Sequence, residues 1–112
     1  LPKCVPPGTQ LQEGKVVKVG EKKYQIFYVS RMWAFEPARV EIPAGSEVEF
    51  YLVSKDVVHG FQIVGKNVNM TAVYGSVNRQ DARFDKPGTF HIICHEYCGF
   101  GHQFMQGEIA VQ

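Results

Sequence analysis

Hydrophobic and polar residues alternate with a period of two along much of this chain. The clearest case is the segment 47–53. Its two faces in an extended strand would carry Val48, Phe50 and Leu52 on one side, and Glu47, Glu49 and Tyr51 on the other. The alternation predicts a strand with one buried and one solvent-exposed face.

Other segments rich in β-branched and aromatic residues predict further strands. They span residues 15–19, 24–29, 39–42, 60–64, 68–73, 77–84, 89–94 and 108–111. Turn residues separate several of them, as in Pro43-Ala44-Gly45 and Lys86-Pro87-Gly88. The total of about eight or nine short strands, with weak helical periodicity, predicts an all-β sandwich or Greek-key barrel.

Composition is that of one globular domain. The chain has 112 residues, of which 45% are hydrophobic and 21% charged, and its formal net charge is +1. Lys and Arg are scattered, so nothing indicates a nucleic-acid partner. No stretch has the roughly 20 apolar residues of a membrane-spanning helix. We expect a soluble piece, with residues 1–14 as an arm left from a linker to a membrane anchor and residues 15–112 as the domain.

Potential metal ligands gather in residues 94–105, CHEYCGFGHQFM, which follow the predicted strand 89–94. Thiolate and thioether sulfur are soft ligands and imidazole is borderline, a mixture that favours copper. Zinc ordinarily uses Cys and His without Met105, and Mg²⁺ or Ca²⁺ prefer oxygen. The stretch is predicted to lie on the loop between the last two strands, where rigid β scaffolds often carry function.

One arrangement is a single blue-copper site, which needs two His, one Cys and a weak axial Met. Cys98, His102 and Met105 would supply three of these ligands, and His59 could supply the fourth from the turn after the strand 47–53. Cys94 would then have no role.

The second arrangement uses both cysteines to bridge two copper ions. Each ion would take one histidine, Met105 would bind one ion weakly, and a main-chain carbonyl near Glu96 would bind the other. An unpaired electron shared by both metals spreads the structural change on reduction over many bonds, which favours fast electron transfer. Gly99 and Gly101 would let the loop curl tightly.

CHEYCGFGHQFM resembles the CuA-binding loop of cytochrome c oxidase subunit II, of form C-x-E-x-C-G-x-x-H-x-x-M. Residues 54–59, SKDVVH, are similar to the S-x-D-V-x-H stretch of that family, and residues 87–90, PGTF, to its P-G-x-[FY]. The similarity extends from about Tyr24 to the last residue and covers most of the chain.

The resemblance implies a cupredoxin-like fold with a mixed-valence, binuclear copper centre. Its ligands would be His59 and His102 (terminal), Cys94 and Cys98 (bridging), Met105 (axial) and Glu96 (main-chain carbonyl). The Glu96 carboxylate would face a Mg²⁺ or Mn²⁺ ion only with oxidase subunit I present. As part of this oxidoreductase, the domain would accept electrons from a c-type cytochrome and pass them to haem in subunit I, at the periplasmic face of the cell membrane.

Two residues outside the ligand set are candidates for supporting roles. The family's tryptophan-rich cluster corresponds here to residues 31–35, RMWAF, so Trp33 is either the residue at which electrons enter or a partly buried aromatic. Asp56 is expected to cap a turn, to support the loop that carries His59, or to do both. The near-neutral charge predicts an apolar docking face for the donor.

Other interpretations are open. A local disulfide between Cys94 and Cys98 would leave His102 and Met105 unexplained. A copper chaperone or sensor, a mononuclear carrier, and the CuA domain of a nitrous oxide reductase are alternative functions, although the last usually has tryptophan at the position of Glu96. Met32 and Met70 are expected to be packing residues.

Overall fold

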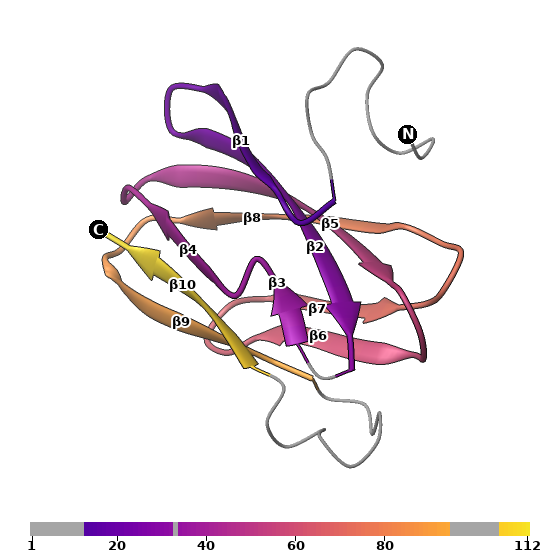
Figure 1. The fold of residues 1–112 in the computed structure, drawn as a ribbon. Helices are drawn as coiled ribbons and strands as arrows, with labels where there is room; N and C mark the ends of the chain where they lie inside the picture. Colours follow the sequence, from indigo (N-terminus) through magenta and orange to yellow (C-terminus); the bar gives the residue numbers. More distant parts are fainter. Residues whose placement is uncertain (1–12, 33, 95–105) are drawn as a thin grey trace.

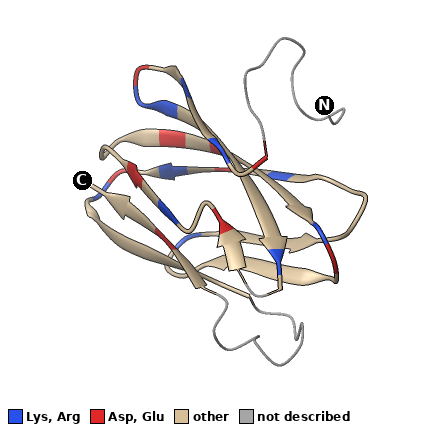
Figure 2. Ribbon diagram, in the orientation of Figure 1, with Lys and Arg blue, Asp and Glu red and all other residues tan. Residues whose placement is uncertain are grey.

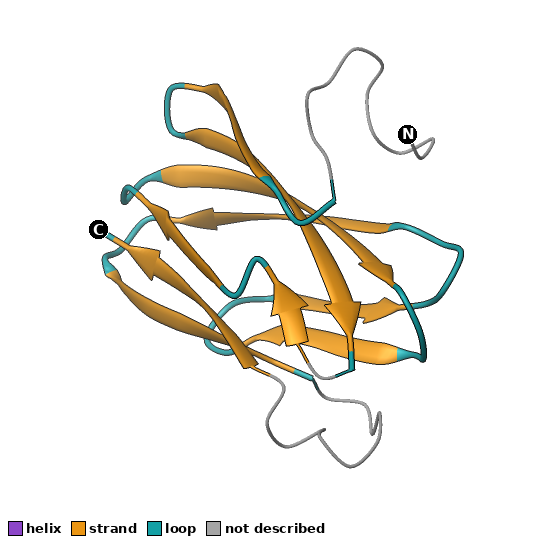
Figure 3. Ribbon diagram, viewed as in Figure 1, coloured by secondary structure: helices purple, strands orange, loops and turns teal. Residues whose placement is uncertain are grey.

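The computed structural model describes residues 13–32, 34–94 and 106–112. Within these ranges the chain forms ten strands and no helix (Figure 3). The strands are β1 (Val16–Gly20), β2 (Lys23–Arg31), β3 (Ala34–Glu36), β4 (Arg39–Ile42), β5 (Ser46–Ser54), β6 (His59–Ile63), β7 (Val68–Ala72), β8 (Asn78–Phe84), β9 (Gly88–Ile93) and β10 (Gln106–Val111). The described part accordingly has no helix that could cross a membrane.

The strands form two sheets that pack face to face (Figure 1). One has the order β1-β2-β5-β8, with β3 added to β2, and the other has the order β4-β10-β9-β6-β7. β2 runs parallel to β5, and β4 runs parallel to β10, while the other neighbours are antiparallel. The predicted all-β sandwich is confirmed.

The core between the sheets is rich in aromatic side chains. Tyr28 lies at its centre, with its ring 4.9 Å from that of Phe61 and 6.0 Å from that of Phe50. The predicted inward face of the segment 47–53 is confirmed, because Val48 and Leu52 are at most 1% exposed. Core packing of this kind supplies most of the stability and fixes both sheets against each other.

The opposite face of the segment 47–53 differs from the prediction. Tyr51, expected to be exposed, is fully buried in a second cluster with Phe27, Val29 and Val53. Val17 of β1 packs against this cluster, and the guanidinium of Arg79 lies 5.6 Å from the centre of the Tyr51 ring. The middle of the outer face of β2 and β5 is therefore covered, while Lys23 and Glu47 at one end and Arg31 at the other are exposed.

The short strand β3 was not predicted, because three residues are too few to show alternation. It pairs with the end of β2, where Phe35 lies opposite Ser30. Met70 is buried in the core as expected, but the prediction that Met32 packs inside is wrong, since Met32 is 46% exposed between β2 and β3. Acidic and basic residues are interspersed over the strands and turns (Figure 2).

Candidate metal centre

The stretch 94–105 joins β9 to β10, as predicted, because β9 ends at Ile93 and β10 begins at Gln106. The end of β9, the start of β6 and the end of β2 lie along the lower edge of the fold in Figure 1. Of the proposed ligands, His59 opens β6 and Cys94 directly follows β9. Glu96, Cys98, His102 and Met105 lie outside the described residues, as does Trp33.

Sheet register brings His59 and Cys94 to the same part of the interior. β6 and β9 are antiparallel, with Gln62 opposite Ile93, and continuing this register beyond the end of β9 would set Cys94 opposite Phe61. His59 lies two residues before Phe61 and points to the same face. Both side chains are buried, His59 at 0% exposure and Cys94 at 7%.

One nitrogen of the His59 imidazole is hydrogen-bonded, and the other has no hydrogen-bond partner among the described residues. Its Nε2 lies 2.6 Å from Oδ1 of Asp56, and because a carboxylate only accepts, Nε2 carries the proton. Its Nδ1 is buried and has no hydrogen-bond partner within the described part of the chain. A buried polar atom without a partner costs about 1–3 kcal/mol. With the proton on Nε2, the buried Nδ1 carries a lone pair that could bind a metal ion.

Asp56 is held by the backbone around it. Its Oδ1 also accepts the N–H of Val57 at 2.7 Å, and its Oδ2 accepts the N–H of Met32 at 2.8 Å. The hydroxyl of Ser54 accepts the N–H of Asp56 at 3.2 Å and donates to the carbonyl of Val57. Asp56 therefore both caps its own turn and links the His59 ring to the connection between β2 and β3.

These contacts keep Asp56 ionised. Burial alone would raise the pKa of its carboxyl, but hydrogen bonds from Met32, His59 and Val57 outweigh that effect and hold the pKa below its ordinary value. The contact with Met32 spans 24 positions in the sequence, so no local pattern could have predicted it. Asp56 is negative at neutral pH and fixes the orientation of the imidazole that it holds.

The donor atoms fit a soft or borderline metal. A thiol and a neutral imidazole, both buried and facing one interior, are ligands that copper accepts. Two such groups do not complete a site, and the described residues contain no cluster of three His, Cys, Asp or Glu side chains.

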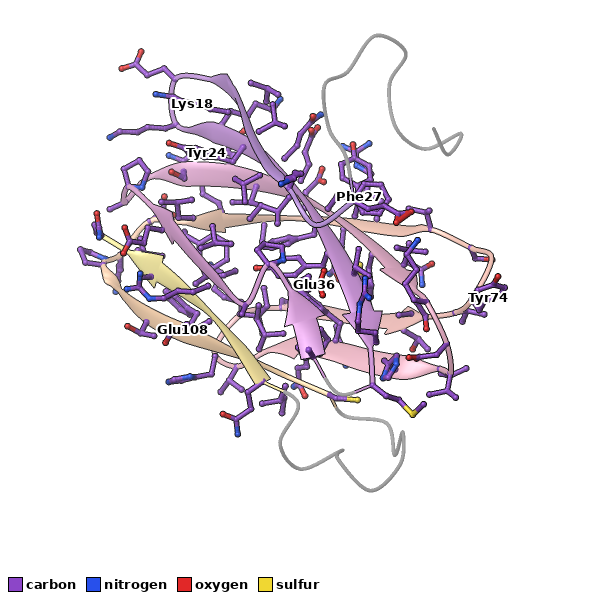
Figure 4. The ribbon with its side chains drawn as sticks, in the orientation of Figure 1. Lys18, Tyr24, Phe27, Glu36, Tyr74 and Glu108 are labelled. Atoms are coloured by element: carbon purple, nitrogen blue, oxygen red, sulfur yellow. The ribbon has the colours of Figure 1, made fainter. Side chains whose placement is uncertain are left out.

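The surface around Asp56 is apolar. Met32, Val57, Val58 and Val73 are 41–46% exposed, and Tyr74, which projects at one edge in Figure 4, is 70% exposed. Charged groups nearby are paired, since Arg31 lies 3.3 Å from Glu36 and Lys55 contacts Glu13. Met32, Val57, Val58, Val73 and Tyr74 are called the apolar rim below.

Comparison with known proteins identifies the family. The family model described as cytochrome C oxidase subunit II, periplasmic domain, matches residues 23–112. Cytochrome c oxidase subunit 2 of Thermus thermophilus is 37% identical over 115 residues, covering 96% of this chain and 85% of the relative. A probable cytochrome c oxidase subunit 2 of Rickettsia bellii is 36% identical over 73 residues, covering 65% of this chain and 27% of the relative.

Solved structures agree. A chain of a heme-copper terminal oxidase dimer, determined by cryo-EM, matches with a TM-score of 0.86 and 44% identity, covering 100% of this chain and 79% of that one. The periplasmic domain of cytochrome oxidase subunit II from Bradyrhizobium japonicum matches in fold with a TM-score of 0.71 at 20% identity, covering 80% and 83%. The cupredoxin-like architecture implied by the resemblance is confirmed. The chain therefore belongs to the family of cytochrome c oxidase subunit II periplasmic domains, and so to a component of an oxidoreductase of the respiratory chain.

Proposed function

We propose that this domain holds a binuclear CuA centre and transfers single electrons from a c-type cytochrome to haem in subunit I. The ligands would be His59 and His102 (terminal), Cys94 and Cys98 (bridging), Met105 (weak, axial) and Glu96 (main-chain carbonyl). The observation that carries this proposal is the buried Nδ1 of His59, which has no hydrogen-bond partner among the described residues. The side chains of His59 and Cys94 are both buried.

The bound copper pair would supply one-electron redox chemistry with the charge spread over both ions. The chain's own residues contribute orientation and rigidity. Asp56 fixes the rotation of the His59 ring through a 2.6 Å hydrogen bond, and β9 delivers Cys94 from a paired strand. Ligands held in this way need little movement when an electron arrives, which is what fast transfer requires.

The position of Cys94 favours the binuclear centre over a mononuclear blue-copper site. A mononuclear site needs one cysteine, and Cys98 is the one spaced suitably from His102 and Met105. Cys94 would then be a buried thiol without a role, although it lies on the same face as His59. Both thiolates have a place only when they bridge two ions.

The proposed partners follow from the same face. The apolar rim beside Asp56, with its neighbouring charges paired, suits a donor that docks through apolar contact, and Trp33 would lie where electrons enter. Subunit I would receive the electron and complete a Mg²⁺ or Mn²⁺ site at the Glu96 carboxylate. We place the domain at the periplasmic face of the cell membrane, with residues 1–14 as an arm toward an anchor and residues 15–112 as the folded unit.

Copper counting and paramagnetic resonance test the proposal. The loaded domain should hold two copper ions per chain and give a seven-line hyperfine pattern, because one electron is shared by two equivalent copper nuclei. Cys94→Ser and Cys98→Ser should each abolish that pattern. The third cysteine of the chain, Cys4, belongs to the arm 1–14 and is not among the proposed ligands, so Cys4→Ser serves as the matched control and should keep the pattern. One copper per chain with a four-line pattern, unchanged by Cys94→Ser, would establish the mononuclear site instead.

A further inference from the structure

We infer that Asn78 and Gln80 of β8 are positioning residues for His59, acting through β7. The inference rests on the proposed role of His59 as a ligand. It concerns what holds the ligand's backbone, whereas Asp56 holds its ring.

The start of β6 is paired on one side only. Within the described residues, β6 pairs with β9 at Gln62 and Ile63, which are its last two positions. Pairing with β7 covers the whole strand and sets His59 opposite Ala72. The position of the His59 backbone therefore depends on β7.

β7 is an edge strand of its sheet, yet its outer edge is not left bare. Nε2 of Gln80 donates to the carbonyl of Asn67 at 2.8 Å, and Oε1 of Gln80 accepts the N–H of Asn69 at 3.1 Å. Nδ2 of Asn78 donates to the carbonyl of Thr71. Two side-chain amides thus satisfy three backbone groups that another strand would satisfy in a continuous sheet.

These contacts tie the β6–β7 hairpin to the other sheet. β8 is paired along β5, with Asn78 opposite Leu52 and Gln80 opposite Phe50. Thr71, which Asn78 holds, lies opposite Gly60, the residue after His59. β5 ends at Ser54, where the loop to His59 begins. The amides therefore link β8, the neighbour of β5, to β7, the neighbour of β6. Through these neighbours they restrict the separation of β5 and β6, the two strands that the loop 55–58 connects.

Core packing alone would not fix this separation. Met70 and Ala72 of β7 are buried, but apolar contact has no direction and tolerates sliding along a strand. Hydrogen bonds to fixed carbonyls define register and distance. The competing explanation is that the amides only shield an edge strand from intermolecular pairing, in which case the ligand would not sense their loss.

Amide hydrogen exchange in the metal-free domain tests whether Asn78 and Gln80 hold the backbone at His59. Asn78→Ala should speed exchange of the backbone N–H groups of His59 to Phe61 by about five- to tenfold, the loss of roughly one hydrogen bond. Asn78→Asp keeps the shape but sets an acceptor against the Thr71 carbonyl, and should be at least as severe. Gln80→Glu keeps the acceptor for the N–H of Asn69 but sets an acceptor against the Asn67 carbonyl, so exchange should be faster than in wild type. Gln25→Ala is the control. The Gln25 amide donates a 2.8 Å hydrogen bond to Glu49, and this bond joins β2 to β5 and does not involve β7.

The copper-loaded domain tests the positioning part. Asn78→Ala should release copper to a chelator several-fold faster and shift the copper–thiolate absorption. Gln25→Ala should do neither, even where it lowers the free energy of unfolding by the same amount. Exchange that rises equally in all strands, or faster exchange at β6 with unchanged copper release and spectrum, would overturn the inference. A wild-type chain that binds no copper would instead overturn the proposed function, and the exchange experiment would still decide whether the amides hold His59.

Discussion

Replacing Asp56 by asparagine is the sharpest single perturbation of the ligand's support. The two side chains have nearly the same shape, but asparagine is neutral and offers one acceptor oxygen where aspartate offers two. Three donors converge on the carboxylate: the N–H groups of Met32 and Val57 at 2.8 and 2.7 Å, and Nε2 of His59 at 2.6 Å. The amide oxygen can serve Val57 and His59, and its NH₂ group then faces the N–H of Met32.

The magnitude follows from these bonds. A hydrogen bond to a charged group contributes about 1.5–3 kcal/mol and a neutral one about 0.5–1.5, so each of the two retained bonds weakens by about 1 kcal/mol. The Met32 bond is lost, at about 1 kcal/mol, since this exposed segment can bind water instead. Asp56→Asn should therefore lower the free energy of unfolding of the metal-free domain by about 3 kcal/mol.

Denaturant unfolding of the metal-free domain measures this loss. The stabilising effect of a carboxylate with a lowered pKa is complete above its unfolded pKa of about 4 and disappears as the pH falls through the folded value. Wild type and Asp56→Asn should therefore converge in stability at acid pH. Asp85→Asn, at a carboxylate whose side chain is 64% exposed, is the control and should change stability by at most about 0.5 kcal/mol.

Copper affinity provides the second measurement. Removing the carboxylate partner of a metal-ligating histidine typically costs about 10–100-fold in affinity. Asp56→Asn should show a loss of that size, and Asp85→Asn none. A stability change below about 1 kcal/mol together with unaltered affinity would refute the assignment of Asp56 as the support of His59.

Three further predictions concern different parts of the domain. Met105→Leu should keep both copper ions but shift the reduction potential, as measured by redox titration, because the axial ligand is weak; loss of one copper would contradict its axial role. Tyr28→Phe should raise the free energy of unfolding by about 1 kcal/mol, because the buried hydroxyl has no hydrogen-bond partner within the described residues; a loss of stability would reveal one. Val58→Asp, in the apolar rim, should slow electron uptake from a reduced c-type cytochrome by about tenfold in stopped-flow experiments, or about 1.4 kcal/mol. Lys18→Glu, in the distant β1–β2 hairpin seen in Figure 4, is its charge control, and equal effects would place docking elsewhere.

Short-range patterns in the sequence predicted the strands well, because alternation and turn residues act locally. The segment 47–53 became β5 with its predicted inward face, and residues 39–42 became β4 at the predicted bounds. The burial of Tyr51 was missed because the cover comes from β1 and from Arg79, which are remote in sequence. The exposure of Met32 was missed because no pattern marks the turn before the three-residue strand β3.

The candidate site also has one part that the sequence predicted and one part that only the fold reveals. Ligand chemistry and spacing predicted His59 and Cys94 as ligands, because each lies in a short motif, 54–59 or 94–105, whose residues are neighbours in sequence. That both side chains share one interior face depends on the β6–β9 register, which is set by long-range pairing. The partner atoms of Asp56 on Met32, and the amides of β8 on β7, are likewise contacts between distant segments. Sequence predicted which groups would bind metal, and only the fold indicates what holds them.

His59 is constrained from two independent directions, and that arrangement suits the proposed function. Asp56 holds the ring at Nε2 and is itself tied to the connection between β2 and β3, while β7 holds the backbone and is tied to β8. If the backbone could shift, or if the ring could rotate freely, Nδ1 would not keep a single position. With both fixed, Nδ1 would keep one position when a bound metal ion changes its charge. An electron carrier gains speed from that property, whereas a copper chaperone, which must release its ion, would be slowed by it.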